Sequence, residues 1–188
     1  MATAILAQLH DLQRGLDWLQ SNRRVVVDLA DWYWGTKGTI FFAGNGGSAA
    51  DAQHAAAELV NGMGALKGGR RAIALTTDSS VLTAVGNDKG FTEIFAAQIH
   101  ALAQPSDLLV LHSTSGFSPN VLRAARAAFE KKIRVVALTG PGGGDLKYVL
   151  AHGRGVLFAC GYPGTSPQTV QTLHQIIQHL AIGEVLRA

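Results

Sequence analysis

The chain has 188 residues, a length that fits one domain able to bury a substantial core. Its net charge of +3 is mild and its basic residues form only short scattered pairs, which argues against a nucleic-acid-binding surface. The single cysteine, Cys160, excludes an intrachain disulfide and a cysteine zinc cluster. With no signal peptide and no apolar run near the ~20 residues of a membrane span, the sequence predicts a cytoplasmic protein without membrane contacts.

Residues 2–34 have the periodicity of amphipathic helices, with apolar residues at intervals of three and four. Ser21 and Asn22 are expected to divide this segment into two helices, the second reaching Trp34. Because both helices precede the first strand, they lie outside the β/α repeat. We expect residues 1–34 to form an extension that packs against another subunit, and the alternative is that it covers the sheet.

Five short apolar runs predict the strands of a parallel sheet that helices cover on both faces. These strands are expected at residues 39–43, 72–75, 107–111, 133–138 and 155–159. Helices are expected at residues 49–59, from about 81 to 86–88, and at 92–102, 121–131, 145–150 and 169–186. This alternation predicts a single α/β domain over residues 1–188.

A glycine-rich turn, Gly44-Asn45-Gly46-Gly47-Ser48, joins the first predicted strand to an alanine-rich helix. Such a turn presents backbone N–H groups to an anion at a helix N-terminus, and Ser48 is the expected N-cap. The turn also fits the dinucleotide pattern G-x-G-x-x-G/A. That alternative is weak, because the first acid after the second strand, Asp78, comes too late for the usual spacing.

Two potential ligands, His54 and Glu58, are four residues apart in that helix and therefore share one face. By themselves they could equally be a surface pair. The last predicted helix carries a polar stripe of Gln171, His174 and Gln178, with His179 nearby. Such a stripe indicates a site or a polar subunit contact, and the geometry alone does not choose between His174 and His179.

A second strand–turn–helix unit carries four hydroxyl groups around one glycine, in Ser113-Thr114-Ser115-Gly116-Phe117-Ser118. Ser118 followed by Pro119 is typical of a helix N-cap with proline at the first helical position. Hydroxyl and amide donors at a helix start suit phosphate oxygens, which are acceptors. We therefore expect phosphate binding here, against the alternative of a turn that only caps its helix.

Four segments resemble the sugar isomerase (SIS) domain family, and more closely its phosphoheptose isomerase branch. They are AGNGGSAADAQHAAAEL (43–59), ALTTDSSVLTAVGNDKGFTEIF (74–95), STSGFSPNVLRA (113–124) and VALTG (136–140). The resemblance implies a three-layer α/β/α, flavodoxin-like fold with a five-stranded parallel sheet. It also implies a homotetramer with active sites at the subunit interfaces.

The resemblance further implies the residues of the site. Substrate would be bound by Asn45, Gly46, Gly47, Asn87, Asp88, Ser113, Thr114, Ser115, Ser118 and Gln171. One zinc ion per subunit would be held by His54, Glu58, Gln171 and His179, a donor set of nitrogen and oxygen atoms that zinc accepts. The eight-residue spacing of Gln171 and His179 is that of the family, and it favours His179 over His174.

The implied reaction converts D-sedoheptulose 7-phosphate to D-glycero-D-manno-heptose 7-phosphate through an enediol, in the heptose biosynthesis that supplies lipopolysaccharide. Glu58 would be the base and His179 the acid. The chain departs from the family at Gly62, where an arginine is usual, and at Gln168-Thr169, where Asp-Arg is usual. Whether Arg70 or Arg71 replaces that arginine stays open. The alternatives are an isomerase of another sugar phosphate and a non-catalytic SIS module that binds a replication initiator.

Overall fold

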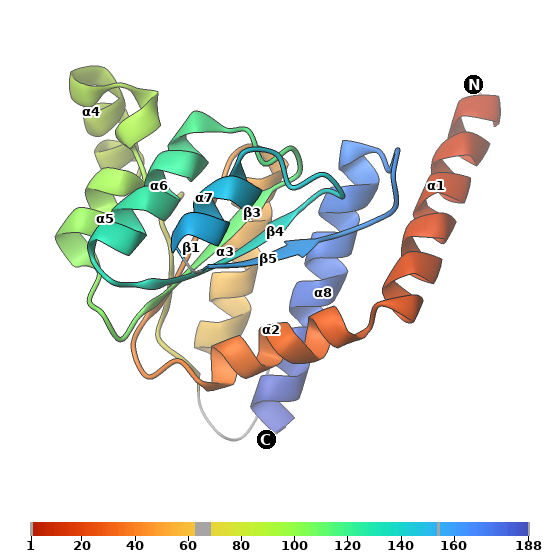
Figure 1. Ribbon diagram of the computed structural model, residues 1–188, viewed down its shortest axis with the longest axis horizontal. Helices are drawn as coiled ribbons and strands as arrows, with labels where there is room; N and C mark the ends of the chain where they lie inside the picture. The colour runs from red at the N-terminus through yellow and green to blue at the C-terminus, as the bar shows by residue number, and fades with distance from the viewer. Residues whose placement is uncertain (1, 63–68, 154, 188) are drawn as a thin grey trace.

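A computed structural model of the chain describes residues 2–62, 69–153 and 155–187. Five parallel strands form one sheet in the order β2-β1-β3-β4-β5, of which Figure 1 labels β1, β3, β4 and β5. The strands are β1 (Ile40–Gly44), β2 (Ala72–Ala74), β3 (Leu108–Ser113), β4 (Arg134–Thr139) and β5 (Val156–Ala159). The expected five-stranded parallel sheet is confirmed.

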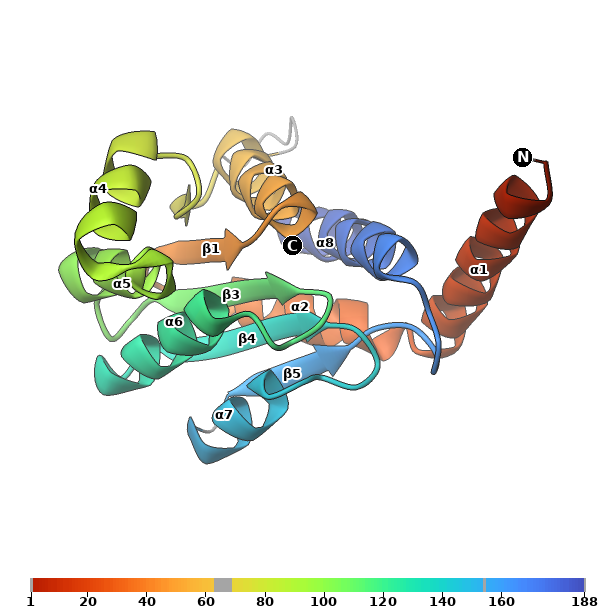
Figure 2. The same cartoon turned by 90° about the horizontal axis from the view of Figure 1, so that it is seen from above.

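Helices cover both faces of this sheet, so the domain has three layers (Figure 2). Strand residues such as Phe42, Val110 and Leu138 pack with α2 (Arg24–Trp34), α3 (Gly47–Asn61) and α8 (Pro167–Arg187). Their neighbours in sequence, such as Phe41 and Leu109, pack against α5 (Ala96–Leu102), α6 (Pro119–Glu130) and α7 (Leu146–Gly153). This period-two alternation gives the sheet two separate apolar cores. No helix within the described ranges is both long enough and apolar enough to cross a membrane.

Two helix predictions need correction. The continuous helix expected over residues 92–102 is wrong, because a 3-10 turn (Phe91–Glu93) precedes α5, which begins only at Ala96. Ser48 is not the N-cap of α3: it is the second residue of the helix and is buried, whereas Gly46 is the N-cap. The φ of Gly46 is +54°, which glycine adopts at little cost and serine does not. Helix α4 (Ser79–Lys89) ends one residue beyond its expected end at residues 86–88.

The N-terminal segment is divided into α1 (Ala2–Ser21) and α2, as expected. Helix α1 reaches away from the body of the domain in both views (Figures 1 and 2). In α1, Asp11 accepts hydrogen bonds from Ser166 and from the Tyr162 hydroxyl, in the segment that precedes α8. These bonds hold the pKa of Asp11 below its ordinary value. These contacts join the middle of α1 to the segment that precedes α8.

Candidate active site

The carboxyl ends of β1 and β3 form the crevice where ligands bind in open α/β sheets. The strands are neighbours, but from β1 the chain continues to β2 on one side and from β3 to β4 on the other. Two amide side chains meet there, because Asn45 follows β1 and Asn120 lies in the first turn of α6. Each donates to the other's oxygen at 2.8 Å. This reciprocal pair holds the glycine-rich turn against the hydroxyl-rich turn.

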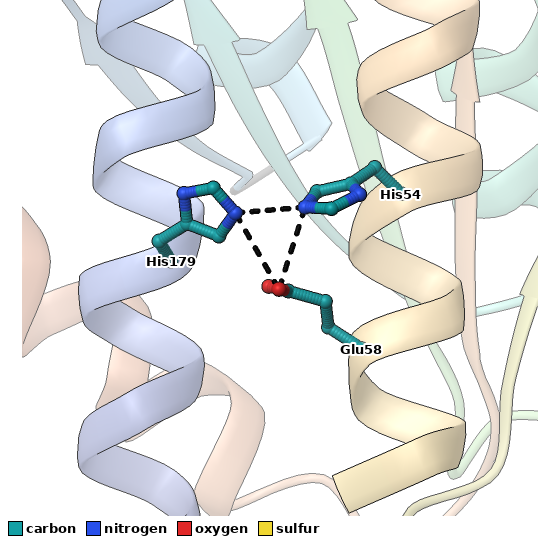
Figure 3. Close-up of side chains that lie close together, drawn as sticks. All are labelled: His54, Glu58 and His179. Carbon is teal, nitrogen blue, oxygen red and sulfur yellow. Dashed lines mark hydrogen bonds and ion pairs between the residues drawn. The ribbon is translucent and has the colours of Figure 1, made fainter. Parts of the chain in front are cut away.

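A cluster of His54, Glu58 and His179 lies between α3 and α8 (Figure 3). The Nε2 atoms of the two histidines are 2.7 Å apart, and each lies 3.4 Å from Glu58 Oε1. The two imidazole side chains are each 41% exposed, while that of Glu58 is only 18% exposed. The helices bring together residues 125 positions apart in the sequence. His179, and not His174, shares the cluster with His54.

The chemistry of this cluster fits a metal ion. Two Nε2 atoms 2.7 Å apart cannot both present lone pairs to one another without repulsion, so a proton or a cation must relieve it. Glu58 Oε2 is buried and has no hydrogen-bond partner among the described residues. Two imidazoles and a carboxylate are a donor set that zinc accepts, with a position left for a further ligand. The geometry therefore supports a divalent metal centre without identifying the metal.

The amide of Gln171 lies about two turns before His179 on α8, next to the start of α3. Its Nε2 donates to Asp51 Oδ1 at 3.4 Å. Its Oε1 lies so close to Gly47 that a Cβ there would come within 2.2 Å of it. The structure thus brings Gln171 to the glycine-rich turn, and no recorded contact within the described residues joins it to the two imidazoles.

Asp51 is a buried carboxyl group at this site that the sequence reasoning did not single out. Burial raises its pKa, against the lowering effects of the Gln171 hydrogen bond and the charge of His54. Its Oδ2 atom has no partner among the described residues. The signal that could have found it is the i, i+3 spacing of Asp51 and His54, which puts both on one face of α3.

The hydroxyl-rich turn begins within β3, because this strand continues through His112 to Ser113. Ser113 Oγ accepts from the Gly116 N–H at 3.1 Å, and Ser115 Oγ accepts from the Phe117 N–H at 3.3 Å. Ser118 is the N-cap of α6, as expected, but its side chain makes no capping hydrogen bond. Its hydroxyl group therefore remains available to a ligand at the helix N-terminus.

Asn87 and Asp88 lie elsewhere in this subunit. Both are exposed on α4, a helix with no buried residue, and Asn87 donates to Asp88 at 2.8 Å. Figures 1 and 2 place α4 apart from the α3–α8 pair. Gly62 is the C-cap of α3, in the left-handed conformation that glycine favours. The guanidinium group of Arg70 donates to Thr36 O at 3.2 Å and lies over the Trp34 ring.

Known proteins resemble this chain over most of its length. The family model of the SIS domain matches residues 20–140. A phosphoheptose isomerase of Nitratidesulfovibrio vulgaris (strain Hildenborough) is 45% identical over 167 residues, which cover 86% of this chain and 72% of that protein. The solved structure of phosphoheptose isomerase from Neisseria gonorrhoeae has a TM-score of 0.84 at 37% identity, covering 100% of this chain and 97% of that one. A phosphoheptose isomerase structure from Francisella tularensis has a TM-score of 0.83 at 28% identity, covering 100% of this chain and 96% of that one.

Proposed function

The chain belongs to the phosphoheptose isomerase branch of the SIS-domain family and is an isomerase, and we propose that it converts D-sedoheptulose 7-phosphate to D-glycero-D-manno-heptose 7-phosphate. The observation that carries the proposal is the cluster of His54, Glu58 and His179. It places a carboxylate and two imidazoles within 4.8 Å of one another, beside the ligand crevice of the sheet. A non-catalytic binding module would have no use for this arrangement.

The reaction moves one proton between adjacent carbons, so it needs a base, an acid and a way to stabilise an oxyanion. We assign Glu58 as the base and His179 as the acid. Glu58 Oε1 faces both imidazoles, whereas Oε2 has no partner within the described chain. One carboxylate oxygen can thus stay with the imidazoles while the other accepts the substrate proton. Glu58 could in this way act as a metal ligand through one oxygen and as the base through the other.

We propose that the metal is zinc, one ion per subunit, held by His54, Glu58 and His179. Zinc, when bound, supplies Lewis acidity toward the two reacting oxygens of the substrate. The amide of Gln171 is the proposed fourth ligand, and it reaches the site from the same helix as His179. Its present partner, Asp51, holds it at the mouth of the crevice.

We propose that the hydroxyl-rich turn binds the substrate phosphate. The hydroxyl of Ser118 is not used in capping, and the N-terminus of α6 adds partial positive charge. Ser113, Thr114 and Ser115 complete the set of hydroxyl groups. Asn45, Gly46 and Gly47 would then contact the sugar across the crevice.

We further propose that the enzyme is a cytoplasmic homotetramer of single-domain subunits that supplies heptose for lipopolysaccharide. Apolar side chains of α1 support oligomerisation, since Ile5, Leu6 and Leu9 are each more than half exposed. Helix α4 has no buried residue, so Asn87 and Asp88 could contribute to a site on another subunit. Light scattering coupled to gel filtration tests the tetramer, and a monomer at micromolar concentration would contradict it.

The decisive experiment incubates the purified protein with sedoheptulose 7-phosphate, with and without added zinc, and follows the aldose product by NMR. Turnover stimulated by zinc is the expected result and would support the reaction, the substrate and the metal together. A metal-loaded protein that leaves this sugar unchanged would contradict the proposal. A panel of other ketose phosphates would then separate a different isomerase from a binding protein.

A further inference from the structure

A chain of buried polar side chains runs beneath the candidate site and is not used by the proposed chemistry. The Tyr33 hydroxyl on α2 donates to Gln178 Oε1 on α8. Gln178 Nε2 lies 2.6 Å from His112 Nε2 at the end of β3. All three side chains are no more than 1% exposed. The chain therefore crosses an apolar core and joins two helices to the central strand of the sheet.

The orientation of the Gln178 amide in the structure sets the role of each atom in this series. Because the Tyr33 hydroxyl donates to the Gln178 oxygen, the Gln178 amide group must be the donor toward His112. His112 Nε2 is then an acceptor, so the proton of the neutral His112 ring lies on Nδ1. His174 has the opposite arrangement, because its Nε2 lies 3.2 Å from the carbonyl oxygen of Thr139 and must donate to it. Burial lowers the pKa of both imidazoles, to about 3 for His112 and about 4 for His174, so both are neutral near pH 7.

Two members of this series are next in sequence to residues of the site. Gln178 directly precedes His179, and His112 directly precedes Ser113. We propose that Gln178 is a positioning residue: its bonds to Tyr33 and His112 fix the rotation of α8, and so hold the His179 imidazole in register with His54 and with the hydroxyl-rich turn. This inference rests on the proposed function for its kinetic test and on the structure alone for the others.

A gain in stability does not explain why Tyr33, Gln178 and His112 are polar. The Nδ1 atoms of His112 and His174 are buried and have no partner within the described residues. Leaving such a group unpaired is costly, whereas replacing a whole polar group by apolar side chains of similar shape can be neutral or stabilising. What an apolar replacement lacks is direction, since a hydrogen bond has a preferred geometry that an apolar contact does not have.

The direction of the hydrogen bonds has a spectroscopic signature. Long-range ¹H–¹⁵N correlation spectra distinguish the two neutral forms of an imidazole ring. We expect His112 to carry its proton on Nδ1 and His174 on Nε2 at pH 7. In the Gln178→Met variant, the His112 ring should no longer be held with its proton on Nδ1 and should exchange between its two neutral forms. A His112 ring protonated on Nε2 in the unmodified protein would overturn the inference.

Function is tested with three variants. Gln178→Met breaks the chain, while Gln175→Met makes the same chemical change on α8 at a half-buried position outside it. The triple variant Tyr33→Phe/His112→Leu/Gln178→Met removes every polar atom of the chain. We expect kcat to fall about tenfold in the first and third variants with KM within threefold, because misplacing a catalytic group affects the chemical step most. The melting temperature of the triple variant should match or exceed that of the unmodified protein.

Zinc binding provides a readout that needs no sugar. In a competition titration against a chromogenic chelator, the zinc affinity should fall about tenfold in Gln178→Met and stay unchanged in Gln175→Met. If Gln178→Met lowers the melting temperature but leaves kcat and zinc affinity unchanged, the inference is overturned, and the bonds of Gln178 serve only the stability of the fold. If the unmodified protein does not isomerise the heptose phosphate, the proposed function fails, and the spectra and zinc titration still decide this inference.

Discussion

Asn45 and Asn120 hold the two ligand turns together, since each amide donates to the other's oxygen at 2.8 Å. Asn120 is only 1% exposed, and its oxygen also accepts from the Val121 N–H at 3.0 Å. One side chain therefore stabilises the start of α6 and the position of Asn45 at once. The pair occupies the crevice between β1 and β3, where the substrate is expected to bind.

Replacing Asn120 by alanine should leave Asn45 without its partner. We expect the free energy of unfolding to fall by about 1–3 kcal/mol, the cost of an unsatisfied polar group, and KM to rise as Asn45 loses its fixed orientation. Urea unfolding and steady-state kinetics measure the two effects. In a double-mutant cycle with Asn45→Ala, the two losses should be strongly non-additive, and additive losses would rule out the coupling.

Replacing Glu58 by glutamine tests the proposed base. The amide has the shape of the carboxylate but cannot accept the substrate proton, so we expect kcat to fall at least about a hundredfold while the fold is retained. The matched control is Glu130→Gln, an exposed carboxylate that pairs with Arg123 on the surface. Metal content must be measured in each variant, because Glu58 also belongs to the candidate metal centre. Near-normal turnover by metal-loaded Glu58→Gln would remove Glu58 from the role of base.

Acid should destabilise the protein through its buried histidines. The pKa values of His112 and His174 are lowered to about 3 and about 4 from 6.5, chiefly by burial, so between pH 6.5 and 4 the unfolded chain binds protons that the folded chain excludes. The contribution of these two neutral rings to the free energy of unfolding is complete above pH 6.5. As the pH falls below that value, the free energy of unfolding decreases by up to about 1.4 kcal/mol per pH unit for each ring. The groups facing His112 are Tyr33 and His174, both neutral in this range. Urea unfolding between pH 7.5 and 5 should show a shallower loss for His112→Leu, and parallel curves would contradict the assignment.

Replacing Gly116 by alanine should disturb the proposed phosphate site. Gly116 has a φ of +71°, and a Cβ there would lie 2.2 Å from Gly143 O, a backbone atom that cannot move aside alone. The Gly116 carbonyl also accepts from the Leu146 N–H at 3.0 Å. We expect a loss of at least about 2 kcal/mol in the free energy of unfolding and a higher KM for the sugar phosphate. Alanine at Gly142, which has open space around it, is the control.

Apolar runs are local signals and were enough to predict the strands, and the four-residue spacing placed His54 and Glu58 on one helix face. The choice of His179 over His174 came only from the family resemblance, because the spacing alone left both open. The strand expected at residues 107–111 stops before His112, although β3 continues through His112 to Ser113. The reason is tertiary: Gly44 and Leu138 pair with His112 from the strands on either side and extend β3 beyond its apolar run. The Asp51–Gln171 contact was not predicted from the sequence for a similar reason, because it depends on how two helices far apart in sequence lie side by side.

The division of the cluster between α3 and α8 also sets an order of events during synthesis. His54 and Glu58 lie on α3, the third helix in chain order, but His179 comes 125 positions after His54. A nascent chain that has not reached α8 carries one imidazole and one carboxylate and exposes the apolar sides of α2 and α3 that α8 later covers. Binding of the proposed metal by all three ligands would therefore follow the docking of α8, which makes it a late event in the maturation of the protein.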